Sequence, residues 1–266
     1  MNLIVCCKQV LDPEVIPVAF QYDAVTNKIN TVPDIHPVIS PFDEQALEAA
    51  LRLKEKWGGW ITVLSLGGNI VRTVMKKTLA LGADELILLE DKSFDGSDSW
   101  STAYAIAMAI KKKKDWDIII CGRQAADWDS GQVGLGVAEL LSIPSVSMAR
   151  KLEVVDGKAR VERVICDGYE VVEVPLPALV TVSNELGEVR HANVRGMMAA
   201  AKKNPIIWKC TDIEMAESAV GVAGRLTKIL RVFQPVRGGK CKIIEAESPE
   251  EAGVKLAEAL REAKIV

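Results

Sequence analysis

Histidine and closely spaced cysteines are scarce in this sequence, and their scarcity excludes several kinds of metal centre. The chain has two histidines and six cysteines among 266 residues. None of the cysteines forms a CxxC pair, whereas zinc sites and iron–sulfur clusters need closely spaced thiolate and imidazole ligands. We therefore expect no metal site. Scattered cysteines of this kind predict reduced thiols in a cytoplasmic protein.

An excess of charge and a long apolar run are also missing. The 33 basic and 36 acidic residues give a net charge of −3, so we expect no nucleic-acid partner. The N-terminal segment MNLIVCCKQV is too short for a secretory signal. No apolar run reaches the roughly 20 residues of a transmembrane helix. These features predict a cytoplasmic protein without a membrane span.

Apolar strands alternate with amphipathic helices through the first half of the sequence. This order is typical of a parallel sheet with helices on both faces, and it predicts an α/β fold. Strands are expected at 3–7, 60–66, 85–90 and 116–121, and helices at 40–56, 70–81, 98–113 and 130–142. A hairpin is expected over 17–32.

The pattern changes after residue 144. Residues 145–183 read as antiparallel strands with Asp-Gly turns and no helix. Residues 187–247 have weak periodicity, which predicts little structure of their own and a role in contacting a partner. A terminal helix is expected over 248–264, with Ser248 as its N-cap and proline next.

We therefore divide the chain into two parts. Residues 1–186 are expected to form an α/β domain, with antiparallel additions near 17–32 and 145–183, whose strand–helix junctions are the candidate nucleotide-binding site. Residues 187–266 form a loop, an arm and a terminal helix.

Two junctions between a strand and a helix, at 33–43 and 121–134, carry most of the polar and glycine residues. Ligands of an open parallel sheet bind beyond the carboxyl ends of its strands, where helix N-termini also point. At the first junction, Ser40 and Asp43 predict a capping box around a helix that begins with Pro41.

At the second junction, Asp129 or Ser130 is predicted to cap a helix whose first free N–H groups would face an anion. Gly131, with glycines at 134 and 136, spells GxxGxG rather than the usual dinucleotide pattern GxGxxG. Asp127 and Asp129 would repel a phosphate unless they face away. A nucleotide site and close packing of helix on sheet therefore both remain open.

No catalytic constellation accompanies these junctions. The two histidines lie far apart in sequence, and no GxSxG, Walker A or HExxH motif is present. The sequence predicts a protein that binds a ligand, without catalytic residues of its own.

Five stretches carry a family resemblance that spans essentially the whole chain. They are VCCKQV, SPFDEQALEAALRLKE, TLALGADELILL, CGRQAADWDSGQVG and EVRHANVRGMMAAAKK. In this order and spacing they resemble the β subunit of electron-transfer flavoprotein.

The resemblance implies an adenine-nucleotide hydrolase-like, Rossmann-like fold without hydrolysis. It also implies a heterodimer with an α subunit that carries a redox-active FAD. The β subunit holds AMP in ordinary members of the family. In electron-bifurcating members the same pocket holds a second FAD that accepts hydride from NADH.

The resemblance also transfers functional residues to this chain by position. The implied cofactor pocket comprises Cys6, Ser40, Pro41, Phe42, Asp43, Leu66, Gly122, Arg123, Gln124, Ala125, Ala126, Asp127, Trp128, Asp129, Ser130, Gly131, Gln132 and Val133. Residues 188–203 match the recognition loop that docks a dehydrogenase, with Arg190, His191, Val194 and Met197 as partner-binding residues. Val194 stands where the family has an exposed leucine.

Three departures from the family pattern bear on the ligand. Ser40 replaces an asparagine before the proline, and Trp128 separates Asp127 from Asp129. Trp128 is expected either to contact the ligand or to pack against the α subunit. The stretch QVG at 132–134 resembles branches from anaerobes and favours FAD over AMP.

The expected function is electron transfer between NADH or ferredoxin and an acyl-CoA or related dehydrogenase, by flavin-based electron bifurcation. One alternative is a simple electron shuttle with structural AMP. Another is a nucleotide-binding protein that acts alone. An ATP-using ligase or hydrolase would need a metal and a phosphate-binding lysine that the sequence does not offer.

Overall fold

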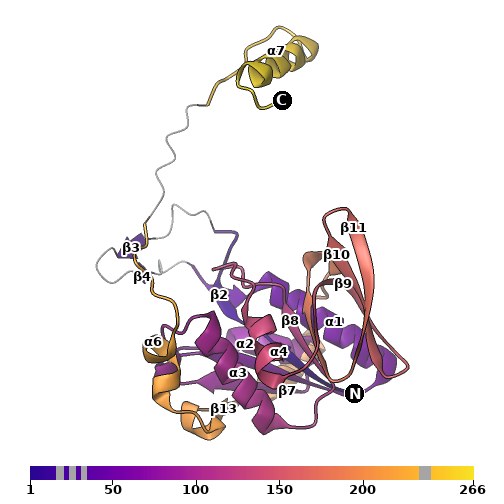
Figure 1. Ribbon diagram of the computed structural model, residues 1–266, viewed down its shortest axis with the longest axis vertical. Coiled ribbons are helices and arrows are strands. Elements are labelled where there is room, and N and C mark those ends of the chain that lie inside the picture. Colours follow the sequence, from indigo (N-terminus) through magenta and orange to yellow (C-terminus); the bar gives the residue numbers. More distant parts are fainter. Residues whose placement is uncertain (16–20, 24–27, 31–34, 234–240) are drawn as a thin grey trace.

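A nine-stranded, mostly parallel sheet lies at the centre of the protein (Figure 1). The computed structural model describes residues 1–15, 21–23, 28–30, 35–233 and 241–266. From edge to edge the strands are β11 (Gly168–Pro175), β10 (Lys158–Ile165), β9 (Ser145–Val155), β12 (Ala178–Val182), β8 (Ile118–Gly122), β1 (Asn2–Cys6), β6 (Trp60–Gly67), β7 (Glu85–Glu90) and β13 (Ile206–Trp208).

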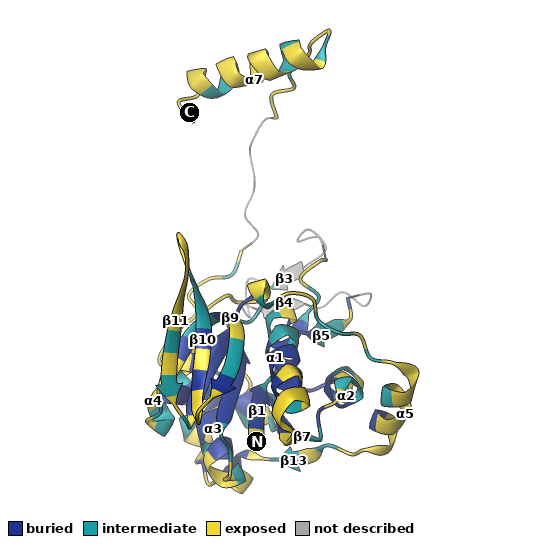
Figure 2. Ribbon diagram, turned by 90° about the vertical axis from the view of Figure 1, so that its right-hand side faces the viewer, coloured by how far each residue is buried: buried dark blue, intermediate teal, exposed yellow. Residues whose placement is uncertain are grey.

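Helices cover both faces of this sheet, as the sequence predicts. α1 (Pro41–Trp57) and α2 (Arg72–Leu81) lie on one face, and α3 (Ser99–Lys113) and α4 (Val133–Leu141) lie on the other. Successive residues of a strand point to opposite faces, so Leu3 and Val5 pack with α1 while Ile4 packs with α3. Figure 2 shows the resulting buried layer in dark blue. Burial of both faces explains why the strands are apolar without interruption.

The antiparallel addition near 145–183 is confirmed for β9, β10 and β11, which pair in that sense. The prediction is wrong for the last strand of this region. β12 returns to the centre of the sheet and pairs in parallel with β8 and β9. All five residues of β12 are buried, which fits a central position rather than an exposed hairpin.

Two small pairs of strands lie outside the main sheet. β2 (Gln9–Leu11) pairs with β5 (Pro37–Ile39), and β3 (Gln21–Asp23) pairs with β4 (Lys28–Asn30), both antiparallel. The predicted hairpin is thus confirmed for its paired strands. Its turn at 24–27 and its flanks at 16–20 and 31–34 lie outside the described residues.

The expectation of little structure over 187–247 is wrong for its first half. α5 (Val194–Lys202) packs against α2, and β13 pairs with β7. α6 (Gly221–Gly224) follows after short 3₁₀ turns. The sheet therefore extends past residue 186. The weak periodicity has a physical cause, because α5 buries Ala200 alone and β13 is three residues long.

After α6 the chain continues as an arm, described over residues 225–233 and 241–247, and ends in α7 (Pro249–Glu262), which stands apart from the body (Figure 1). Ser248 caps α7 as predicted, since its side chain accepts a hydrogen bond from the Glu251 N–H at 3.2 Å. No residue of α7 is buried. Within the described parts of the chain, no helix has the length and hydrophobicity needed to cross a bilayer.

Candidate functional site

The strand order creates a crevice between β1 and β8. From β1 the chain moves to β6 and β7 on one side and then returns to β8 on the other side. Ligands of doubly wound sheets bind at such a reversal, beyond the carboxyl ends of the strands. A cleft of about 660 Å³ opens there, within the roughly 300–1,000 Å³ of small-molecule sites.

The buried carboxylate of Asp43, in the first turn of α1, holds the two strand ends together. It accepts hydrogen bonds from the Lys8 N–H at 2.7 Å and the Gly122 N–H at 3.1 Å. Gly122 is required at this approach, since a β-carbon there would lie 2.5 Å from Asp43 Oδ1. Burial raises the pKa of Asp43 to about 7, against the opposing effect of those hydrogen bonds.

The capping box predicted for α1 is wrong, because the Asp43 side chain does not bond back to Ser40. The helix does begin at Pro41, but the Ser40 side chain makes no cap hydrogen bond. Asp43 turns instead toward the strand ends, where two backbone donors meet its carboxylate. Ser40 is fully buried, and among the described residues its hydroxyl has no hydrogen-bond partner.

The loop after β8 keeps its two acids away from the start of α4. Asp127 pairs with Lys8 Nζ at 2.7 Å, and Asp129 accepts a hydrogen bond from Gln124 Nε2 at 2.8 Å. Neither acid caps α4, which begins at Val133 with Gln132 at the N-cap and no side-chain cap. The predicted cap at Asp129 or Ser130 is therefore wrong. The first N–H groups of α4 have no partner inside the helix, and no acid of its own loop takes them.

The three glycines of the GxxGxG pattern have different roles: two allow close packing of α4 against its neighbours, and one shapes the loop beside the cleft. Gly134 and Gly136 serve packing, since their β-carbons would lie 3.1 Å from Thr181 Cγ2 and 3.0 Å from Ala103 Cβ. Gly131 instead shapes the loop beside the cleft, with φ of +62°. That left-handed backbone favours glycine.

Twelve of the predicted pocket residues line the cleft, and six do not. Those that line it are Cys6, Asp43, Leu66, Gly122, Arg123, Gln124, Ala125, Trp128, Ser130, Gly131, Gln132 and Val133. The others are Ser40, Pro41, Phe42, Ala126, Asp127 and Asp129. Phe42 still supports the site, because the Arg123 guanidinium lies over its ring at 4.7 Å.

Sequence reasoning missed the opposite wall of the cleft. It consists of the glycines at the end of β6, the approach to α3 and the first part of the arm, namely Gly67, Gly68, residues 94–100, Arg225, Leu226, Thr227 and Ile229. The Asp98 and Ser101 side chains form a capping box at the start of α3, and that spacing is visible in the sequence. The arm offers no comparable signal.

The donors and surfaces of the cleft fit an anionic nucleotide. Arg123 Nε is buried and has no hydrogen-bond partner among the described residues. Together with the first N–H groups of α4, which no side chain caps in the described residues, it suits a phosphate. Trp100 and Trp128 line the same cleft, and Trp128 is 61% exposed, so its ring is available for stacking.

Three cysteines lie at the floor of the cleft. The hydrogen bond to Cys6, together with burial, raises the pKa of the Cys121 thiol, and burial raises that of Cys7. These two groups are therefore neutral thiols at physiological pH, and we assign no nucleophilic role to them. In the described ranges, no three His, Cys, Asp or Glu side chains gather where they could hold a metal ion.

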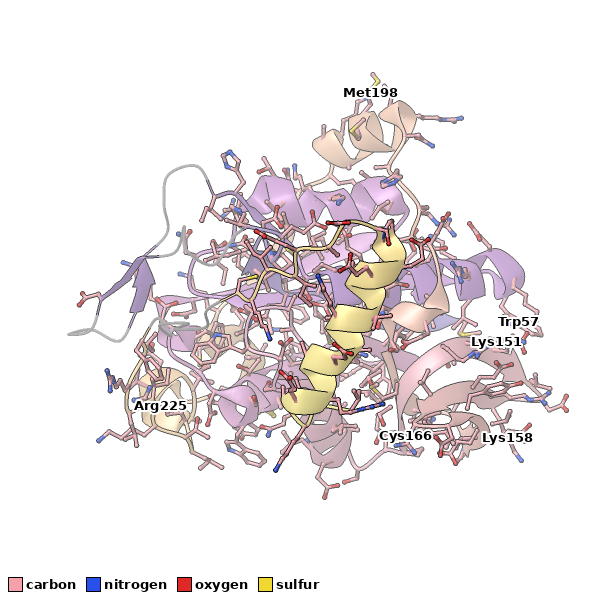
Figure 3. The ribbon with its side chains drawn as sticks, turned by 90° about the horizontal axis from the view of Figure 1, so that it is seen from above. Trp57, Lys151, Lys158, Cys166, Met198 and Arg225 are labelled. Carbon is pink, nitrogen blue, oxygen red and sulfur yellow. The ribbon has the colours of Figure 1, made fainter. Side chains whose placement is uncertain are left out.

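The predicted partner-binding residues occupy two different environments. Arg190 binds Glu48 Oε2 at 2.8 Å through Nε and also pairs with Glu55, which fixes the loop to α1. His191, Val194 and Met197 are exposed, with Val194 at 68%. Met198, which was not among the predicted residues, is exposed beside them and projects from α5 in Figure 3.

Comparisons with known proteins agree with this fold. The family model of the electron transfer flavoprotein domain matches residues 34–213. The chain is 40% identical over 238 residues, 88% of each chain, to the electron transfer flavoprotein subunit beta of Thermoanaerobacterium thermosaccharolyticum. It is 36% identical over all of both chains to the caffeyl-CoA reductase-Etf complex subunit CarD of Acetobacterium woodii. Protein FixA of Azorhizobium caulinodans is 34% identical over 97% of this chain and 93% of its own. The chain therefore belongs to the electron transfer flavoprotein family, as a beta subunit.

Proposed function

We propose that this chain pairs with an electron transfer flavoprotein α subunit that carries FAD, and that it binds an adenine nucleotide in the cleft between β1 and β8. The observation that carries the proposal is the start of α4. Within the described residues no side chain caps its first N–H groups, and its neighbouring acids Asp127 and Asp129 are engaged elsewhere. An adenosine phosphate there would also meet Arg123, whose buried Nε has no partner among the described residues.

We infer further that the nucleotide is FAD rather than AMP. The cleft of about 660 Å³ extends from the start of α4 to the start of α3 and the arm, which leaves room beyond an adenosine phosphate. Trp100 and Trp128 provide aromatic faces for a flat ring system. The QVG stretch at the start of α4 favours the same assignment.

A flavin in this cleft would supply the chemistry that splits an electron pair from NADH between a low-potential carrier such as ferredoxin and the FAD of the α subunit. The residues of this chain would bind and orient it. Asp43 keeps the two strand ends together under the ligand, and the neutral thiols of Cys7 and Cys121 present an apolar floor.

The surface of α5 is the proposed docking site for a dehydrogenase. Val194, Met197 and Met198 are exposed on one short helix, and Arg190 fixes the preceding loop to α1. Valine in place of leucine buries one methylene less, or roughly 0.8 kcal/mol. The CarD relative is named for a caffeyl-CoA reductase complex, which makes an acyl-CoA or related dehydrogenase the proposed partner class.

The main alternative is an electron shuttle in which this subunit holds structural AMP, and the same phosphate donors would serve it. A nucleotide-binding protein that acts alone is the weaker alternative. Leu226, Leu230 and Ile243 leave large apolar side chains exposed along the arm, and α7 buries nothing, so the arm suits a partner.

The test is to co-produce this chain with its α subunit and to count the nucleotides released from the purified complex. We expect an αβ heterodimer that releases two FAD. One FAD and one AMP would refute bifurcation and leave the shuttle. A chain that stays monomeric beside the α subunit, with the arm resistant to protease, would refute the heterodimer.

A further inference from the structure

The carboxylate of Asp98 joins the start of α3 to the start of the arm. One oxygen, Oδ1, accepts the Ser101 N–H at 3.0 Å and so caps α3. The other, Oδ2, accepts the N–H groups of Leu226 and Thr227 at 2.8 and 2.9 Å, and the Thr227 hydroxyl at 3.0 Å. Burial would raise the pKa of Asp98, but these hydrogen bonds lower it to about 2, so the group is ionised at neutral pH.

This attachment places Arg225 in the wall of the cleft. Arg225 directly precedes the two residues that Asp98 holds, and it is half-buried and lines the cleft. Within the described residues no carboxylate lies within 4 Å of its guanidinium, in contrast to Arg190. Figure 3 shows Arg225 and Met198 on different sides of the molecule, so this wall is separate from the α5 surface.

The two walls of the cleft meet across a short distance. The Ser99 hydroxyl in the first turn of α3 donates to the Ser130 hydroxyl before α4 at 3.1 Å. A nucleotide with one phosphate at α4 would therefore present its next phosphate toward α3 and the arm. An arginine that lacks a carboxylate partner is suited to that second anion, because its fork of N–H donors matches phosphate oxygens.

We propose that Arg225 binds the second phosphate of an adenine diphosphate or dinucleotide, and that Asp98 positions it by fixing the arm. The proposal rests on the nucleotide site assigned above. It adds that the cleft selects a diphosphate over AMP, and that filling the cleft orders the arm.

The first test compares AMP with ADP, which adds only the second phosphate, by titration calorimetry of the full-length chain. Arg225→Gln is expected to weaken ADP binding about tenfold, the effect of losing one charge-assisted hydrogen-bonded contact, and to change AMP binding less than about twofold. Lys228→Gln is the matched control, because it also removes one positive charge from the arm but Lys228 does not line the cleft. It should change neither the AMP affinity nor the ADP affinity.

The second test concerns the positioning role of Asp98. Asp98→Asn retains a good N-cap for α3 but lacks the second oxygen that holds the arm. It should therefore weaken ADP binding to a similar extent, without a loss of AMP affinity. In the wild-type chain, ADP should slow tryptic cleavage after Lys228 and Arg231, whereas AMP should not.

Equal losses of AMP and ADP affinity in Arg225→Gln would overturn the inference, as would no loss of either. If ADP does not change the rate of tryptic cleavage in the arm, the proposed coupling between nucleotide binding and ordering of the arm is refuted. A wild-type chain that binds neither nucleotide would overturn the proposed function as well. A chain that prefers AMP to ADP would overturn the selectivity alone.

Discussion

The buried carboxyl group of Asp43 makes the stability of the protein depend on pH in a defined direction. The pKa of Asp43 rises from its ordinary value of 3.8 to about 7 in the folded chain. Between these values the folded protein keeps the proton that the unfolded chain releases, so the free energy of unfolding falls as pH rises. A shift of this size corresponds to about 4 kcal/mol.

The perturbation that isolates this contribution is Asp43→Asn, which cannot titrate. We expect the difference in unfolding free energy, wild type minus variant, to fall by about 4 kcal/mol between pH 4 and pH 7 and to stay constant above. Urea unfolding at one-unit intervals from pH 4 to pH 9 measures it. The reasoning is refuted if the difference rises with pH, since the N–H groups of Lys8 and Gly122 would then outweigh burial.

Three further predictions concern the Asp43 contact, the loop before α5 and the α5 surface. Gly122→Ala places a β-carbon 2.5 Å from a carboxylate oxygen of α1 and should cost about 1–3 kcal/mol in urea unfolding, whereas Gly253→Ala, with open space around it, should cost nothing. Glu48 is buried and its ion-pair partner Arg190 is partly buried, so a double-mutant cycle with Glu48→Gln and Arg190→Gln should give a coupling of about 1–3 kcal/mol. A value below about 0.5 kcal/mol would contradict the anchoring of the loop. Val194→Asp should leave the unfolding free energy within about 0.5 kcal/mol of wild type but slow electron transfer to the partner dehydrogenase, and an unchanged rate would move the docking site elsewhere.

The central sheet could be predicted because burial on both faces leaves a plain pattern. Strands such as β6 and β8 are apolar without interruption, and the helices between them are amphipathic. The position of the cleft follows from the order of these strands and from the polar loop after β8. Twelve of its lining residues were therefore within reach of the sequence and the family resemblance.

Local hydrogen bonding was less predictable, because a capping residue has more than one possible partner. Asp43 has the spacing of a capping box but bonds to strand ends far away in the sequence. Asp129 precedes α4 but bonds to Gln124 within its own loop. Such choices depend on which donors the tertiary fold brings near, and spacing does not report that.

The part of the cleft wall formed by the arm could not be predicted from the sequence, for a related reason. Arg225 and Thr227 stand in a segment without periodicity, and what brings them to the cleft is one carboxylate, Asp98, more than 120 residues earlier. β13 and α5 were missed because short elements that bury few residues leave no repeating pattern.

The most direct test of the nucleotide site is the effect of Gln132→Glu on AMP affinity. Gln132 is the N-cap of α4, is exposed and lines the cleft. A carboxylate there would stabilise the helix by about 0.3–1 kcal/mol but repel a bound phosphate. Calorimetry should show AMP binding at least about tenfold weaker in Gln132→Glu than in Gln132→Ala, with thermal stability equal or higher. Unchanged AMP affinity in a variant of raised stability would contradict the account, because the phosphate would then not lie at the start of α4.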